Sequence, residues 1–487
     1  MGVLNNLQPK SVFYFFEQIS QIPRGSGNQK AISDYIVEFA KQRGLNFRQD
    51  EAYNVLVTKS GTKGFENAPS VIFQGHIDMV CKKGMESEHD FLTEPLTLKI
   101  DGNYVHADNT TLGADNGIAV AYMLAILDSK DMEHPPIEAV FTTDEEIGML
   151  GAYAFDASDL KGKTFINIDT DEEGKFIISC SGGQRAEIQL PIERENSLQE
   201  SIPYVFEISG LLGGHSGADI HLQRANANKL LGRVLHKVCN AFHLKVASIS
   251  GGSVDNAISS NAEAVLLVKT EDIEKIQAVL EEIQSIFRNE YQAVQENTIT
   301  VSMRKLQEKV EKVFTDETTK KAIDILLLIP YGVMTVSFDE KIKGLVESSN
   351  NIGVVRTTDT DIIFLNAIRS SVVSKKHAIY EQIEAIARLT GAKAIASASY
   401  PAWELKEDSK IVSLFESVYQ KIFNKTPKIE SIHAGLECGV FSEKIKGLDA
   451  ISIGPNIIAE HTERESLDIA SVARMWELIK EVLKRLK

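Results

Sequence analysis

The sequence is poor in cysteine and tryptophan, and what cysteine it has is scattered. Its 487 residues include only four cysteines and two tryptophans. Cys81, Cys180, Cys239 and Cys438 form no CxxC pair and lie far apart in the chain. In a chain of this length that spacing argues against a disulfide framework and predicts a reducing compartment.

An excess of positive charge is also missing. Lysine and arginine total 52 against 68 aspartates and glutamates, which gives a net charge of −16. Such a chain has no basic patch to neutralise phosphates, so we expect no nucleic-acid partner and no binding to an anionic membrane. No run approaches the ~20 apolar residues of a membrane span, and the first residues lack the pattern of a signal peptide. We therefore expect a cytoplasmic protein.

The length predicts two or three domains. Residues 9–44 show helical periodicity, and short apolar strands then alternate with helices up to about residue 184. This alternation predicts an α/β domain with a doubly wound sheet. The predicted elements that matter most here are a helix at 115–127 and strands at 54–58, 70–74, 137–142 and 164–168.

The pattern changes at about residue 185. The next six predicted elements follow the order β-α-β-β-α-β, which is ferredoxin-like. They lie at 204–209, 225–242, 244–250, 263–269, 271–291 and 298–304. A looser second set follows, with helices at 317–328 and 375–389 and strands at 333–338, 353–357, 362–366 and 392–399. From about residue 404 the α/β pattern returns and ends in a helix at 467–486. We therefore expect a catalytic domain made of residues 1–184 and 404–487, with an α+β insertion of two ferredoxin-like units at 185–403.

Acidic residues and histidines gather where apolar strands end, where one helix starts and, for the last of them, in a loop near the end of the sequence. This set comprises His76, Asp78, Asp115, Glu145, Glu146, Asp169 and, much later, His461. The carboxyl ends of the strands are where an α/β sheet places its active site. Histidine and carboxylate without thiolate are the ligands of a catalytic zinc ion, and the carboxylates outnumber what one metal needs. The set predicts a two-metal hydrolase.

Each of these residues also has an ordinary interpretation when taken alone. Asp115 could cap a helix N-terminus, and Asp169 could belong to a turn. Glu145 and Glu146 could form a solvated acidic turn, and His461 could be a loop histidine. Their joint occurrence favours the metal site.

Together these segments resemble a known family. The motifs G-H-I-D-M-V, L-G-A-D-N-G-I, T-D-E-E-I-G-M, N-I-D and the late H-T-E are similar to those of the M20 co-catalytic metallopeptidases. Gly213–Gly217 and His433–Gly439 point to the aminoacyl-histidine dipeptidase (Xaa-His dipeptidase) branch, although His433 itself matches no required role. The resemblance covers essentially the whole chain.

The resemblance implies specific roles. Asp115 would bridge two Zn²⁺ ions per subunit, for which Co²⁺ or Mn²⁺ could substitute. His76 and Asp169 would complete one metal site, and Glu146 and His461 the other. Glu145 would be the general base, and Asp78 would orient His76. The family also implies a cis peptide between Asp115 and Asn116.

The insertion would act as a lid that carries substrate-binding residues. His215 would donate a hydrogen bond to the oxyanion, and Asn256 and Arg369 would hold the substrate and its carboxylate. Each also has an ordinary alternative, because His215 and Asn256 could belong to turns and Arg369 could be a surface arginine.

The expected reaction is hydrolysis of dipeptides with a free C-terminal carboxylate, with Xaa-His dipeptides such as carnosine as the expected substrates. The alternatives are an amidohydrolase that deacylates N-acyl amino acids, a tripeptidase, and a non-catalytic metal- or peptide-binding protein. The expected partner is a small peptide, and a homodimer remains an open alternative.

Overall fold

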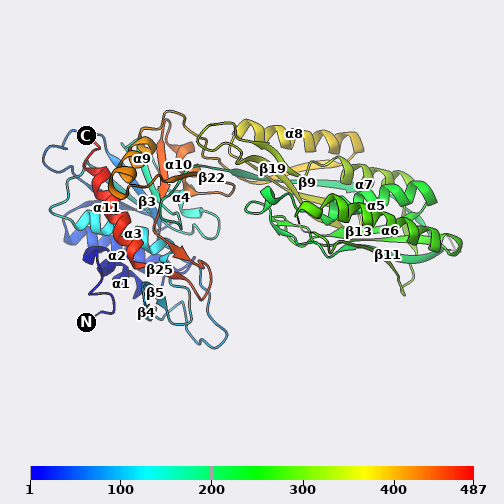
Figure 1. Cartoon of the computed structure of the whole chain (residues 1–487), viewed down its shortest axis with the longest axis horizontal. Helices are drawn as coiled ribbons and strands as arrows, with labels where there is room; N and C mark the ends of the chain where they lie inside the picture. The colour runs from blue at the N-terminus through cyan, green and yellow to red at the C-terminus, as the bar shows by residue number, and fades with distance from the viewer. Residues whose placement is uncertain (1, 198–200, 295) are drawn as a thin grey trace. The chain divides into compact units, whose positions relative to one another are not determined.

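The chain forms two compact units. The computed structural model describes residues 2–197, 201–294 and 296–487. Unit 1 runs up to Ser179 and continues over Leu405–Ser431 and Leu436–Lys487, whereas unit 2 comprises Cys180–Glu404 and Ile432–Gly435. Both ends of the chain therefore belong to unit 1, and most of unit 2 is one long insertion (Figure 1).

Unit 1 is built on an eight-stranded sheet. In spatial order its strands are β1 (Asn46–Gln49), β2 (Val55–Lys59), β6 (Ile137–Thr142), β3 (Val71–His76), β7 (Thr164–Ile168), β23 (Asp449–Ile453), β8 (Lys175–Cys180) and β22 (Lys428–Ile432). The four central strands β6, β3, β7 and β23 are parallel. Their carboxyl ends therefore meet at one edge of the sheet.

The central strands are apolar because both faces of the sheet are covered. Every residue of β3, β6 and β23 is buried, as expected for strands of a parallel sheet packed between helices. The helices of this unit are α1 (Lys10–Ser20), α2 (Lys30–Gln42), α3 (Ala114–Asp128), α4 (Leu150–Ala154), α9 (Lys410–Phe423), α10 (Glu437–Lys444) and α11 (Ile469–Leu483). The expected α/β fold with a doubly wound sheet is confirmed.

One predicted element of unit 1 was wrong at its start. The helix expected over 467–486 begins at Ile469, and the preceding residues form a short strand. This strand, β25 (Ser466–Asp468), belongs to a small sheet with β24 (Ile457–Ile458), β5 (Tyr104–Ala107) and β4 (Leu98–Asp101). Asp468 caps the helix by accepting a hydrogen bond from the Ser471 N–H, so the helix cannot extend further back.

Unit 2 is built on a second, larger sheet. Its strands in spatial order are β16 (Thr300–Lys305), β11 (Ser201–Ser209), β15 (Ala262–Lys269), β13 (Lys245–Gly251), β19 (Val346–Thr357), β20 (Asp361–Ser370), β9 (Gly182–Pro191) and β21 (Lys393–Tyr400), and β18 (Gly332–Val336) pairs with β19. Four helices run along one side of this sheet (Figure 1): α5 (Ala227–Phe242), α6 (Ile273–Glu290), α7 (Asp316–Leu328) and α8 (Val373–Thr390). Two short ladders accompany the sheet, β10 (Arg194–Asn196) with β17 (Lys312–Phe314), and β12 (Gly214–His215) with β14 (Ala257–Ile258).

The two ferredoxin-like units are present, but one is nested inside the other. The first uses β11, α5, β13, β15, α6 and β16, with the strand order fourth, first, third, second. The second has the same order, yet its first strand is β9, which precedes the whole first unit in the chain. The first strand of the second unit was not predicted from the sequence, because β9 lies more than a hundred residues before the first helix of that unit, α7.

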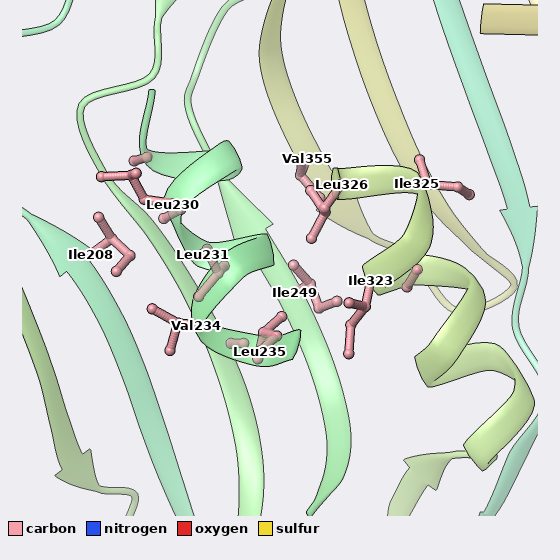
Figure 2. Close-up of a cluster of buried hydrophobic side chains, with 14 of the residues drawn as sticks. Ile208, Leu230, Leu231, Val234, Leu235, Ile249, Ile323, Ile325, Leu326 and Val355 are labelled. Carbon is pink, nitrogen blue, oxygen red and sulfur yellow. The ribbon is translucent and has the colours of Figure 1, made fainter. Parts of the chain in front are cut away.

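The cores of the two ferredoxin-like units merge into one. Figure 2 shows side chains of α5 and α7 packed against the sheet, and they belong to one buried cluster with those of β11, β13 and β19. Gly232 allows the two helices to approach closely, because an added Cβ there would lie 2.7 Å from the Leu326 Cβ. A fully buried leucine or isoleucine contributes about 1.5–3 kcal/mol, so this shared cluster stabilises unit 2 by itself. No helix among the described residues is long and apolar enough to cross a membrane.

Candidate metal centre

The polar residues predicted from the strand ends meet at the carboxyl edge of the unit 1 sheet. His76 is the last residue of β3, and Asp169 directly follows β7. Glu145 and Glu146 follow β6 after a turn in which Asp144 has a left-handed φ of 51°. Parallel pairing of β3 with β6 and β7 sets these ends side by side.

Asp115 lies between two histidines. Its Oδ1 is 3.1 Å from the His76 Nε2, and its Oδ2 is 3.0 Å from the His461 Nε2. On one side the Asp169 Oδ1 lies 3.5 Å from the same His76 nitrogen, and on the other the Glu146 Oε1 lies 3.1 Å from the His461 nitrogen. The two oxygens of Asp115 thus face two separate sets of ligand atoms.

This set of donors fits a metal site. His76, Asp115 and Glu146 each offer a ligand atom within 4.8 Å of one another. Glu146 and Asp169 are largely buried, with 8% and 9% of their side chains exposed, so neither belongs to a solvated turn. Both oxygens of Asp115 face histidine nitrogens rather than the first turn of α3, which argues against the helix-cap interpretation of Asp115. Imidazole nitrogen and carboxylate oxygen without thiolate suit a catalytic zinc ion.

Asp78 contacts the His76 imidazole at the ring nitrogen that does not face Asp115. Its Oδ1 lies 3.3 Å from the His76 Nδ1, which has no other partner among the described residues. The same carboxylate accepts hydrogen bonds from the backbone N–H groups of Glu145 and Glu146 and from the Ser26 hydroxyl. Asp78 therefore links the orientation of the imidazole to the turn that carries both glutamates.

The loop before Asp115 is held by a buried carboxylate and a buried guanidinium. Glu465 accepts hydrogen bonds from four consecutive backbone N–H groups, those of residues 112–115, at 2.7–3.2 Å. Arg24, which is 1% exposed, donates to the carbonyl oxygens of Ile77, Asp78 and Gly113. The peptide between Asp115 and Asn116 is cis, which confirms that prediction, and the Asn116 amide donates to the Asp169 Oδ1 at 2.8 Å.

Sequence reasoning missed Arg24 and Glu465. Glu465 lies four residues after His461, in the same polar segment, and that spacing could have drawn attention to it. Nothing in the sequence around Arg24 distinguishes it from a surface arginine. Both act on backbone groups, which leave no pattern in the side chains.

The centre holds more carboxyl groups than its histidines can neutralise. Burial raises the pKa of Glu145 well above its usual value, and Asp169, Glu437 and Glu146 add to the rise while the His76 imidazole opposes it. Burial likewise raises the pKa of Asp169, against the effect of His76. Crowded carboxyls of this kind need bound cations or shared protons.

In unit 2, His215 is held in one tautomer. The backbone N–H groups of Gly217 and Ala218 donate to its Nδ1 at 3.3 and 3.0 Å. When the ring is neutral its hydrogen is therefore on Nε2, which can donate. Burial and the nearby Arg369 charge lower the pKa of His215, which favours this neutral form.

Arg369 lies close to His215, and Asn256 is connected to them through the backbone. A Cβ added at Gly217 would lie 3.0 Å from the His215 Cε1 and 3.2 Å from the Arg369 Cζ. Arg369, on β20, donates to the Tyr400 hydroxyl at 2.8 Å. Asn256 is exposed, and its backbone carbonyl oxygen accepts a hydrogen bond from the Ser216 N–H. The three predicted substrate-binding residues thus belong to one region of unit 2.

Histidines and carboxylates around one central aspartate, at the carboxyl edge of the parallel strands, fit the class of metal-dependent hydrolases. The chain belongs to the peptidase family M20/M25/M40, whose family model matches residues 72–485. This match confirms the resemblance seen in the motifs, and it makes the chain a metallopeptidase.

The similar proteins agree with this assignment over the full length. The chain is 36% identical to the cytosol non-specific dipeptidase of Escherichia coli, covering 100% of this chain and 99% of that protein. The crystal structure of an aminoacylhistidine dipeptidase from Vibrio alginolyticus matches with a TM-score of 0.94 and 36% identity, over 99% and 98% of the two chains. Aminopeptidase PepT from Bacillus cereus matches with a TM-score of 0.56 at 14% identity, which shows a shared fold.

Proposed function

We propose that this enzyme is a metallodipeptidase that cleaves dipeptides with a free C-terminal carboxylate, Xaa-His dipeptides among them. The observation that carries the proposal is Asp115, whose two oxygens face two separate histidines at 3.1 and 3.0 Å. Two full-length relatives at 36% identity are dipeptidases by name, and this supports the same substrate class here.

Two Zn²⁺ ions would be held at the centre, with Asp115 shared between them. His76 and Asp169 would complete one site, and Glu146 and His461 the other. When bound, the ions supply the Lewis acidity that activates water and polarises a carbonyl. The all-nitrogen-and-oxygen donor set supports zinc, and Co²⁺ or Mn²⁺ accept the same donors.

The protein side chains divide the remaining work. Glu145 would take the proton of the attacking water and pass a proton to the leaving amine. Asp78 would keep the His76 ring in place. The Nε2 hydrogen of His215 would stabilise the oxyanion, because the Nδ1 already accepts backbone hydrogen bonds.

Arg369 and Asn256 would bind the substrate. A guanidinium pairs well with a carboxylate, and the Tyr400 hydroxyl at 2.8 Å fixes the Arg369 side chain. Arg369→Ala should then raise KM for dipeptides with a free carboxylate and have little effect on amidated ones. An equal loss on both substrates would contradict this role.

A substrate panel tests the proposal against its rivals. We expect the zinc-loaded enzyme to hydrolyse carnosine and Gly-His faster than an N-acetyl amino acid or a tripeptide. Preference for the acetylated substrate would favour a deacylase, and preference for the longer peptide a tripeptidase. A zinc-loaded protein inert on all four would indicate a binding protein.

The name of one relative also bears on the cellular location of this enzyme. The Escherichia coli relative is named for the cytosol, so we infer a cytoplasmic enzyme. A homodimer is the oligomeric state to be tested by light scattering.

A further inference from the structure

A buried polar network lies below the metal centre in unit 1. Four residues with 0% exposure form it: Gln74, Thr142, Asn167 and Glu437. In the parallel ladders Gln74 pairs with Asn167, and His76 pairs with Thr142. Gln74 is two residues before His76, so the network and the imidazole share one face of the sheet. None of these four residues has a role in the function proposed above.

Hydrogen bonds connect the four residues across three strands. The Asn167 amide on β7 donates to the Gln74 Oε1 on β3 at 2.7 Å. The Gln74 amide donates to the Thr142 Oγ1 on β6 at 3.0 Å and also to the Glu437 Oε2. The Thr142 hydroxyl donates to the same Glu437 oxygen at 2.8 Å. Glu437, the first residue of α10, thus closes a network that joins the three ligand-bearing strands.

Only one of the two carboxyl oxygens of Glu437 takes part in the network. Its Oε2 accepts both bonds, whereas its Oε1 is buried and has no hydrogen-bond partner among the described residues. No ion pair to Glu437 occurs in the described part of the chain, and an unpaired buried carboxylate is unfavourable. Burial, together with the nearby Asp169, raises the pKa of Glu437 to about 8, although His76 opposes the rise. Glu437 therefore contributes to the network through the two hydrogen bonds that its Oε2 accepts.

We propose that Glu437 is a positioning residue of the metal centre. Through Gln74 and Thr142 it fixes the ends of β3 and β6, and so the spacing between His76 and Glu146. The inference rests on the proposed two-metal function. Residues that orient metal ligands in this indirect way typically affect metal affinity or activity by about 10–100-fold.

The test compares three variants. Glu437→Leu removes the acceptor, Glu437→Gln keeps an acceptor oxygen and the shape, and Glu138→Gln is the matched control. Glu138 is a buried glutamate of β6 that accepts from the Lys161 and Gly162 N–H groups, outside this network. Zinc affinity is measured by competition with a chelator. The values of kcat and KM are measured with Gly-His as the substrate, and the melting temperature is measured on the zinc-free protein.

We expect Glu437→Leu to lower zinc affinity and kcat by about 10–100-fold each, with KM nearly unchanged. Glu437→Gln should keep both within about threefold, because its amide oxygen still accepts from Gln74 and Thr142. Glu138→Gln should leave zinc affinity unchanged. Thr142→Val removes one hydrogen-bond donor to Glu437 and should lower zinc affinity, as Glu437→Leu does. This variant replaces Glu437→Leu in the test if Glu437→Leu does not fold.

Two results would overturn the inference. Wild-type zinc affinity in Glu437→Leu, with only a lower melting temperature, would make Glu437 a purely structural residue. An equal loss in Glu437→Gln would mean that the carboxyl group itself is required rather than its hydrogen bonds. If the wild-type protein binds no divalent metal at all, that result contradicts the proposed function itself and not only the role of Glu437.

Discussion

The position of protons decides what the individual residues of this enzyme can do. His215 has its Nδ1 occupied by backbone N–H groups, so its Nε2 is the donor. Glu145 lies in a buried, acidic environment that raises its pKa well above the usual value. Cations bound nearby would favour the ionised form of that carboxyl and make it available as a base.

Glu145→Gln tests the role of this carboxyl. The substitution keeps the size of the side chain and removes the base, so kcat should fall by about 10²–10⁴. Zinc content, measured by atomic absorption after dialysis, should stay at the wild-type value. Loss of zinc together with activity would instead make Glu145 a ligand.

His433 predicts a pH dependence of stability. Burial and the nearby positive charge of Arg369 lower the pKa of His433 from 6.5 to about 3. Between pH 6.5 and about pH 3 the His433 imidazole is protonated in the unfolded chain but neutral in the folded protein. His433 therefore destabilises the folded state as the pH falls below 6.5. It should contribute a slope of about 1.4 kcal/mol per pH unit in the free energy of unfolding.

Urea unfolding between pH 4 and pH 7 measures this slope. His433→Gln removes the titrating group and can still hydrogen-bond to Ser181 and Ser349, which contact the wild-type ring at 2.7 Å. The variant should show the smaller pH dependence. Parallel curves for the two proteins would show that His433 takes up its proton in the folded state.

At the scale of single elements, side-chain caps decide where several helices begin. Thr315, Ser409 and Asp468 accept hydrogen bonds from backbone N–H groups in the first turns of α7, α9 and α11. The cap at Asp468 ends β25 and starts α11 within a single residue. Local polar groups thus override the helical periodicity of the flanking sequence.

Asp468→Ala should remove this cap. The free energy of unfolding should fall by about 0.5–2 kcal/mol, measured by urea denaturation of the zinc-loaded enzyme. Asp468→Asn retains an acceptor for the Ser471 N–H and should lose much less. If both variants lost the same amount, the charge of Asp468 would matter more than its capping hydrogen bond.

At the scale of the whole molecule, both units have buried apolar side chains, but only unit 1 contains the acidic metal centre. Unit 2 has a continuous apolar core shared by both ferredoxin-like units (Figure 2). Unit 1 buries crowded carboxyls at the edge of its sheet, and we expect bound cations to add to its stability. The units should respond differently to the loss of metal.

Removal of metal by a chelator should destabilise unit 1 selectively. A ligand present at about 100 times its Kd stabilises the folded state by about 2.7 kcal/mol, and this contribution disappears on chelation. Calorimetry should show one unfolding transition that moves to lower temperature with chelator and returns with zinc, while a second stays unchanged. Two transitions that shift together would contradict the separate stability of unit 2.

Much of the fold could be predicted from local patterns in the sequence. The strands at Ile137–Thr142 and Thr164–Ile168 have the predicted bounds, because a buried parallel strand is a short apolar run that ends where polar residues begin. The nested second ferredoxin-like unit could not be found in this way. Its strand β9 pairs with β20, whose residues lie about 180 positions later in the chain, and no local pattern encodes that pairing.

The sequence by itself determined which side chains stand at the ends of the strands. His76, Glu146 and Asp169 were identified after strands, Asp115 near the start of a helix and His461 in a loop. The structure brings these five residues together, although their metal roles stay predictions. Only the tertiary structure decided what holds them in place. The contact of Gln74 with Glu437 spans 363 positions, and Arg24 and Glu465 bind backbone groups of distant loops. Such contacts depend on how the chain folds back on itself, so residue type and spacing along the sequence cannot reveal them.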